Sequence, residues 1–159
     1  MEPIIKYKFE LPFPLSVNAI YKMAIRGRYG NTLPHPHIYL TTEAKDLKDE
    51  MALMIRNQAL AQKMPKWKDT YLIFELTPFN IRKDADTDNL YKLTQDAFAL
   101  SGYVDNDKYF INRTISRQMT PDKIRKVEVV IYETKGMPSQ EDIKRYFYWL
   151  NNEEITLDK

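Results

Sequence analysis

The sequence contains no cysteine. A disulfide framework and a cysteine-based zinc site are therefore both excluded, and the chain suits a reducing cytoplasm. No apolar run approaches the roughly 20 residues that a membrane-spanning helix needs. The N-terminal stretch MEPIIKYKFELPF also lacks the long apolar segment of a signal peptide. We therefore expect a soluble, cytoplasmic protein without a membrane partner.

Glycine is scarce as well, with four residues in a chain of 159, and no flexible linker divides the sequence. Internal repeats of fixed period are absent too. Apolar residues make up 43% of the chain, which is enough for one domain with a single core. The net charge of +2 neither requires nor excludes a nucleic-acid partner. Whether nucleic acid is a partner therefore has to be judged from the placement of charges along the chain.

The pattern of apolar residues predicts an α+β fold, with a mixed β-sheet packed by two main helices. Alternation over residues 4–11 predicts a first strand, and a β-branched and aromatic run over 70–79 predicts a buried one. Helical spacing predicts helices over 41–64 and about 87–101. Residues 108–119 and 124–133, around the turn TPDK, are typical of a β-hairpin. Residues 21–40 indicate a hairpin or a long loop.

Cap residues support both main helices. Thr41 or Thr42 is placed to cap the first helix, whose apolar stripe contains Met51 and Ile55. Gly102 stands where the second helix needs a residue in the left-handed conformation. That helix has its own apolar positions at three- and four-residue steps: Leu90, Leu93, Ala97 and Leu100.

The C-terminal residues predict a third helix. SQED has the form of a capping box and follows Pro138, and Ile143, Phe147 and Leu150 then recur at helical spacing. We expect residues 136–159 to be a helical extension of the domain formed by residues 1–135.

The stretch DADTDNLYK carries three carboxylates at alternating positions, Asp84, Asp86 and Asp88. It lies between the predicted buried strand and the second helix. In extended backbone, residues two apart project to the same side, so these side chains are able to converge before the helix begins. A helix cap at Asp86 or Asp88 would explain only one of them. A further acidic pair, Asp105 and Asp107, follows the helix.

Several carboxylates around one point suit Mg²⁺, for which Mn²⁺ is a common substitute. Such a site requires the chain to bring Asp107 back to the start of the second helix. Lys92 would then reach a phosphate oxygen, whereas by local spacing alone it forms an ion pair with Asp88 worth about 0.3–0.5 kcal/mol. A calcium-binding EF-hand fits less well, because Asn89 stands where that loop needs Gly and Gln95 where it needs Glu.

Basic side chains surround the acidic stretch. An acidic centre with a basic surround is the charge pattern of a metal-dependent nuclease, in which the ion activates water and neutralises the scissile phosphate. His35 and His37 have no third ligand nearby and stay outside the predicted site. The candidate DNA contacts are Arg26, Arg28, Arg82, Lys83, Lys108, Arg113 and Arg117.

The stretch DTDNLYK, followed by Asp96, Gly102 and NDK, resembles the RusA family of Holliday junction resolvases. The family pattern runs Asp-x-Asp-Asn-Leu-x-Lys, then Asp-Ala, then Gly, then usually Asp-Asp. This chain departs from it at Asn106, where the first acid of the terminal pair is expected. Upstream, LPFPLSVNAIY is similar to the family opening Leu-Pro-aromatic-Pro-x-Ser-x-Asn, with Asn18 in register. The resemblance covers residues 4–133.

This resemblance implies a homodimeric, Mg²⁺-dependent endonuclease that places paired, symmetric nicks in four-way DNA junctions. It implies that Asp86, Asp88 and Asp107 are catalytic metal ligands. Lys92 becomes the catalytic lysine beside the scissile phosphate. Asn89 would support the acidic site by hydrogen bonding, and Asn18 joins the candidate DNA contacts. Asp84 falls outside the family pattern, and we expect it beside the metal ligands or facing the solvent.

Two other functions stay open. The replacement of an acid by Asn106 also fits a protein that binds branched DNA but cuts it weakly or not at all. A calcium-binding module is the third alternative, and it would bind Ca²⁺ in strong preference to Mg²⁺.

Overall fold

The computed structural model describes residues 5–14, 21–26, 35–82, 87, 90–114, 117–133, 141 and 145. Its main sheet has four strands in the order β1-β6-β4-β5. Strand β6 is antiparallel to both β1 and β4, whereas β5 is parallel to β4, so the sheet is mixed. The strands are β1 (Lys6–Pro12), β4 (Leu72–Phe79), β5 (Phe110–Thr114) and β6 (Lys126–Glu133).

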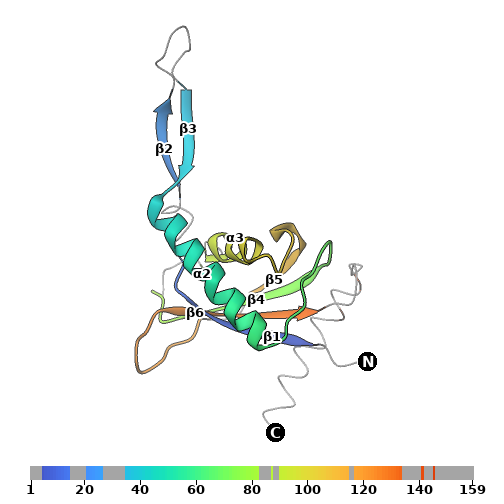
Figure 1. Cartoon of the computed structure of the whole chain (residues 1–159). Helices are drawn as coiled ribbons and strands as arrows, with labels where there is room; N and C mark the ends of the chain where they lie inside the picture. Colours follow the sequence, from blue (N-terminus) through green and yellow to red (C-terminus); the bar gives the residue numbers. More distant parts are fainter. Residues whose placement is uncertain are drawn as a thin grey trace.

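Helices α2 (Thr42–Ala61) and α3 (Tyr91–Ser101) lie on the same face of this sheet (Figure 1). The predicted α+β fold is therefore confirmed. Thr41 caps α2, because its hydroxyl oxygen accepts a hydrogen bond from the Ala44 N–H at 3.2 Å. Gly102 ends α3 with a φ of 81°, a left-handed conformation that glycine adopts without steric cost.

The start of α3 differs from the prediction. The helix begins at Tyr91 rather than near Thr87, and Leu90 occupies the N-cap position without a side-chain hydrogen bond. Asp86 and Asp88, the predicted cap residues, lie outside the described residues. Leu100 is predicted on the apolar face, but it is exposed, and the last turn of the helix buries Phe98 and Ser101 instead.

The core lies between the two helices and the sheet, and aromatic rings form its centre. The ring of Phe98 on α3 packs edge-on against Phe9 of β1 and Phe74 of β4, with centroids 5.0 and 5.5 Å apart. Met51 and Ile55 of α2 are fully buried in the same cluster, as their spacing predicts. Arg56 of α2 also donates to the carbonyl oxygens at the C-terminal end of α3, which stabilises that helix end.

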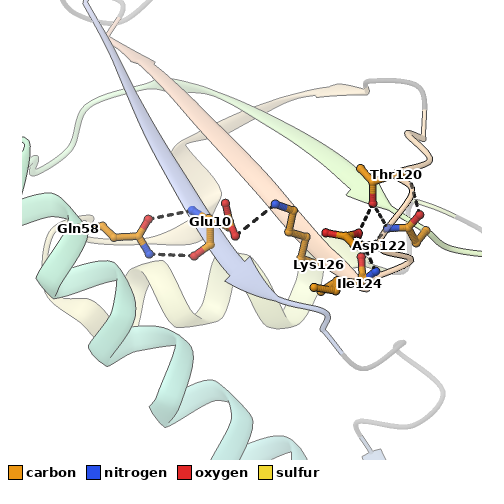
Figure 2. A network of polar contacts seen from close by, with 7 residues as sticks. Glu10, Gln58, Thr120, Asp122, Ile124 and Lys126 are labelled. Atoms are coloured by element: carbon orange, nitrogen blue, oxygen red, sulfur yellow. Dashed lines mark hydrogen bonds and ion pairs between the residues drawn. The ribbon is translucent and has the colours of Figure 1, made fainter.

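The predicted hairpin of residues 108–133 is wrong, because β4 lies between β5 and β6. After α3 the chain enters β5 beside β4 in parallel, so the connection to β6 has to pass β4. The turn itself is present: the Thr120 hydroxyl and the Ile124 N–H both donate to Asp122 (Figure 2). These two hydrogen bonds lower the pKa of the Asp122 carboxyl below its usual value.

Strands β2 (Tyr21–Arg26) and β3 (His35–Leu40) form a separate antiparallel pair. This pairing confirms the hairpin reading of residues 21–40 over the long-loop reading. The hairpin projects beyond the N-terminal end of α2, away from the main sheet (Figure 1).

The C-terminal helix predicted from Ser139 lies outside the described residues, except for Glu141 and Arg145, which are both helical and exposed. Among the helices of the described ranges, none is both long enough and apolar enough to cross a membrane.

Gln58 of α2 and Gln62, the C-cap residue of this helix, cover the outer edge of β1. The side-chain amide of Gln58 accepts from the N–H of Glu10 and donates to its carbonyl oxygen, both at 2.8 Å (Figure 2). Gln62, one helical turn later, makes the same two hydrogen bonds with Lys8, at 2.8 and 2.6 Å. The backbone groups of Lys8 and Glu10 are thus paired although none of the described strands lies beside them, which protects this part of the edge from pairing with another chain.

Replacing both Gln58 and Gln62 by Ala is expected to lower the free energy of unfolding by about 2–6 kcal/mol, because four hydrogen bonds at about 0.5–1.5 kcal/mol each are lost. Urea denaturation with an unchanged slope would measure this loss. Asn57→Ala, at an exposed position of the same helix, is the control and should change the stability by no more than about 0.5 kcal/mol. A loss no larger than that of the control would contradict the role assigned to the two amides.

Candidate functional site

Lys92, in the first turn of α3, lies between two carboxylates. Its Nζ is 2.8 Å from Oδ1 of Asp96 and 3.3 Å from Oδ2 of Asp107. Asp96 is one helical turn further along α3, and Asp107 opens the 3-10 helix η2 (Asp107–Tyr109), 15 residues after Lys92. The chain therefore returns Asp107 to the start of the second helix, as the predicted metal site requires.

The charge of Lys92 is stabilised in this arrangement. The hydrogen bond to Asp96 is the main cause that raises the pKa of Lys92, and the attraction of both carboxylates adds to it, while partial burial acts in the opposite direction. Lys92 is therefore protonated at neutral pH. The side chains of Lys92 and Asp107 are 43% and 36% exposed, so both are accessible to a ligand from solvent.

Asn106 helps to hold Asp107 in place. It is the N-cap of η2, and its side-chain oxygen accepts from the N–H of Lys108 at 3.0 Å. An aspartate at this position would accept the same hydrogen bond, so Asn106 keeps the cap and removes only the charge. The ammonium of Lys108 lies 4.9 Å above the ring of Tyr109, whose hydroxyl is hydrogen-bonded to Asp69. The segment that carries Asp107 is thus fixed at both ends.

Asn80 fastens the segment that leads from β4 into the acidic stretch. It has a φ of 58°, which asparagine tolerates better than most residues. Its side chain donates to the Thr120 hydroxyl at 2.7 Å and accepts from the Thr120 N–H at 2.9 Å, and its own N–H donates to Gln118. Asn80 is not among the predicted site residues, although an Asn directly after a strand is a turn signal.

Two of the predicted DNA contacts lie beside this segment. The guanidinium of Arg117 donates to the carbonyl oxygen of Arg82 at 2.6 Å, so the two arginines are neighbours. Arg82 is exposed and Arg117 is half-buried. Together they place positive charge at the point where the chain enters the acidic stretch.

Arg113 has a different environment. Its guanidinium forms an ion pair with Glu75 of β4 at 2.5 Å, and these side chains are only 11% and 9% exposed. The Tyr132 hydroxyl of β6 lies 3.4 Å from the same carboxylate. Because the Arg113 side chain is nearly buried and is held by Glu75, we do not retain it on the path of a DNA phosphate.

Asp96 belongs to the motif, but the sequence predicts no role for it. Local spacing pairs Lys92 with Asp88, whereas Asp96 is equally one turn away on the C-terminal side, and the structure places it 2.8 Å from the Lys92 ammonium. Asp88 lies outside the described residues, so its pairing with Lys92 stays a prediction.

Several predicted site residues are not placed by the structure. Within the described part of the chain, no group of three or more His, Asp or Glu side chains is close enough to hold a metal ion. The side chains of Arg26 and His35 lie outside the described part as well. The remaining predicted residues outside it are Asn18, Arg28, Lys83, Asp84, Asp86, Asp88 and Asn89.

The donor chemistry of the placed residues fits a Mg²⁺ ion. Asp96 and Asp107 already share one cation, the Lys92 ammonium, and Asp107 uses only one of its two oxygens for it. Carboxylate oxygens are the protein ligands that Mg²⁺ prefers. Asp107, together with Asp86 and Asp88 of the adjoining stretch, would hold the ion.

Comparison of the sequence with protein-family models and with curated proteins found no match. The RusA resemblance therefore rests on the residues of the motif alone, and the family stays a prediction.

Proposed function

We propose that the protein is a Mg²⁺-dependent endonuclease that resolves Holliday junctions by paired, symmetric nicks, in DNA recombination and repair in the cytoplasm. The observation that carries the proposal is the contact between Lys92 and Asp107 at 3.3 Å. It joins DTDNLYK and NDK, the two halves of the motif, which are separated by a whole helix in the sequence.

Each residue of the site has a separate task in this proposal. Asp86, Asp88 and Asp107 hold the metal ion, which when bound lowers the pKa of a coordinated water and neutralises phosphate charge. Lys92 donates a hydrogen bond to a non-bridging phosphate oxygen and stabilises the negative charge that develops there. Asp96 holds the Lys92 ammonium from the helix side and so directs it toward the phosphate.

The surroundings of the site suit a DNA backbone. Exposed Arg82 and half-buried Arg117 are neighbours just before the acidic stretch, and exposed Lys108 directly follows Asp107. Phosphate contacts of this kind position DNA without reading its sequence. A homodimer would supply two such centres related by a two-fold axis, which matches the symmetry of a four-way junction.

The test is a nicking assay with the full chain on a synthetic mobile four-way junction, with a linear duplex of the same sequence as the control substrate. We expect symmetric nick pairs on the junction in Mg²⁺ or Mn²⁺, no nicks after EDTA, and little cutting of the duplex. Binding without nicks would favour the branched-DNA-binding alternative. Tight Ca²⁺ binding without Mg²⁺ binding in calorimetry would favour the calcium-binding module.

A further inference from the structure

The segment over residues 117–126, which we call the basic turn, lies between β5 and β6 and forms a loop beyond the start of β6 (Figure 1). It contains a single acid, Asp122, whose carboxylate accepts hydrogen bonds from the Thr120 hydroxyl and the Ile124 N–H inside the turn (Figure 2). The segment therefore presents an excess of positive charge. Its cations are Arg117, Lys123, Arg125 and Lys126.

Two of these cations have no carboxylate partner in the described structure. Lys123 and Arg125 are both exposed, and neither takes part in an ion pair with a described acid. The Arg125 guanidinium lies 4.5 Å from the centroid of the Phe13 ring, which holds the cation without neutralising it. Lys126, by contrast, is paired with Glu10 at 3.2 Å (Figure 2). Lys123 and Arg125 are thus available to an anionic ligand.

Apolar side chains are exposed beside these cations. Met119 has 70% of its surface accessible and Ile124 has 58%. Ile124 also stands directly between Lys123 and Arg125 in the sequence. Proteins that bind distorted DNA combine these two features, because cations contact the phosphates while apolar side chains such as Met and Ile pack against unstacked bases. The basic turn therefore has the composition of a surface for distorted DNA.

Hydrogen bonds fasten the basic turn to the segment that leads into the acidic stretch. The Asn80 side chain donates to the carbonyl oxygen of Ile124 at 2.5 Å and to the Thr120 hydroxyl at 2.7 Å. Asn80 precedes Asp86, a predicted metal ligand, by only six residues, which is at most about 21 Å of extended chain. Since a DNA strand carries one phosphate per about 3.4 Å of helix axis, the turn lies within about six phosphates of the predicted metal site.

We propose that the basic turn binds the junction at its branch point, beside the scissile phosphate. Lys123 and Arg125 bind phosphates of the strand that enters the metal site, and Met119 and Ile124 pack against bases that are unstacked where the arms meet. The choice of DNA as the ligand rests on the proposed function. A linear duplex offers the same phosphates but no unstacked bases, so the cations should serve affinity for both substrates and the apolar side chains selectivity for the junction.

Fluorescence anisotropy of the full chain in EDTA tests the cations, with a synthetic four-way junction and a linear duplex over a salt series. Replacing both Lys123 and Arg125 by Gln should weaken binding to each substrate by about tenfold or more and lower the slope of log affinity against log salt by about 2. The control replaces Lys66 and Lys68 by Gln. Both are exposed before the other end of β4, and Lys66 also lies over an aromatic ring. Because distant charges are screened, this control should change affinity by no more than about twofold.

The same titrations test the apolar side chains. Met119→Ser combined with Ile124→Ser should lower the preference for the junction over the duplex by about fivefold or more, because apolar contact area with the bases is lost. The salt slope should stay unchanged. The control is Leu53→Ser combined with Leu60→Ser, at two exposed positions of α2, which should leave the preference as it is. If the first double variant does not fold by circular dichroism, Met119→Ser alone replaces it.

Unchanged affinity and salt slope after replacement of Lys123 and Arg125, in a protein that nicks junctions, would overturn the role of the basic turn and leave the nuclease function standing. Equal losses in the control with Lys66 and Lys68 would overturn it as well. If loss of the Phe13 contact unfolds the protein, Lys123→Gln alone should lower the slope by about 1. An unchanged junction preference after the serine changes would overturn contact with the branch point. A wild-type protein that binds neither substrate would overturn the proposed function and this inference together.

Discussion

Asp107→Asn is expected to lower the rate of junction nicking by about a thousandfold while leaving junction binding nearly unchanged. The amide has the shape of the carboxylate but no charge, and metal-assisted stabilisation of a phosphate is worth several kcal/mol, with about 1.36 kcal/mol for each factor of ten in rate. Lys92 keeps its hydrogen bond to Asp96 at 2.8 Å, so the helix start should stay intact. Single-turnover nicking and fluorescence anisotropy at fixed salt concentration would measure the two effects.

Asp105→Asn is the matched control, because it removes the same charge from an exposed side chain two residues away. Surface substitutions of this kind change free energies by about 0.5 kcal/mol at most, so nicking should fall no more than about twofold. Equal losses in the two variants would show that general charge in this loop is responsible. Full nicking activity of the Asp107→Asn variant would show that Asp107 is not a metal ligand.

Glu75→Leu is expected to lower the free energy of unfolding by about 3–5 kcal/mol. The change leaves the Arg113 guanidinium buried between strands without its carboxylate partner, which is the costly way to break a buried ion pair. Urea denaturation followed by circular dichroism would measure the loss. Arg113→Met should be destabilising for the converse reason, because Glu75 then stays buried without its cation.

The double variant Glu75→Leu with Arg113→Met separates this explanation from simple loss of packing. Replacing a whole buried pair by apolar residues is often close to neutral, so the double variant should be more stable than either single variant. Additive losses would contradict the assignment. If Arg113 contacted a DNA phosphate after all, the double variant would also lower the slope of junction affinity against salt by about 1.

Local signals in the sequence predict much of this fold. The extent of α2, its cap at Thr41, the buried strand before the acidic stretch and the end of α3 at Gly102 each depend on residues within a turn or two. The wrong hairpin prediction over residues 108–133 has a non-local cause. Alternation identifies β5 and β6 as strands but carries no information on which strands they pair with, and in the sheet β4 lies between them.

The same distinction holds for the candidate site. The motif identifies Lys92 and Asp107, and the structure brings them together. The motif could not show that Asn80 fixes the segment before the acidic stretch, because its hydrogen-bond partner Thr120 is 40 residues away in the sequence. The burial of Arg113 likewise depends on β5 lying beside β4, which no local pattern predicts.

The two glutamines on α2 have a consequence for the direction in which the hairpin points. Four residues of an α-helix advance about 6 Å, and two residues of a strand advance about 6.8 Å, so amides one turn apart match alternate residues of β1. Gln58 binds Glu10 and Gln62 binds Lys8, which fixes α2 antiparallel to β1 and at one register. Since β3 ends at Leu40 and α2 begins at Thr42, this 20-residue helix, about 30 Å long, connects the hairpin directly to the packed core. The register of α2 on the edge of β1 therefore also determines the direction in which the hairpin leaves the domain.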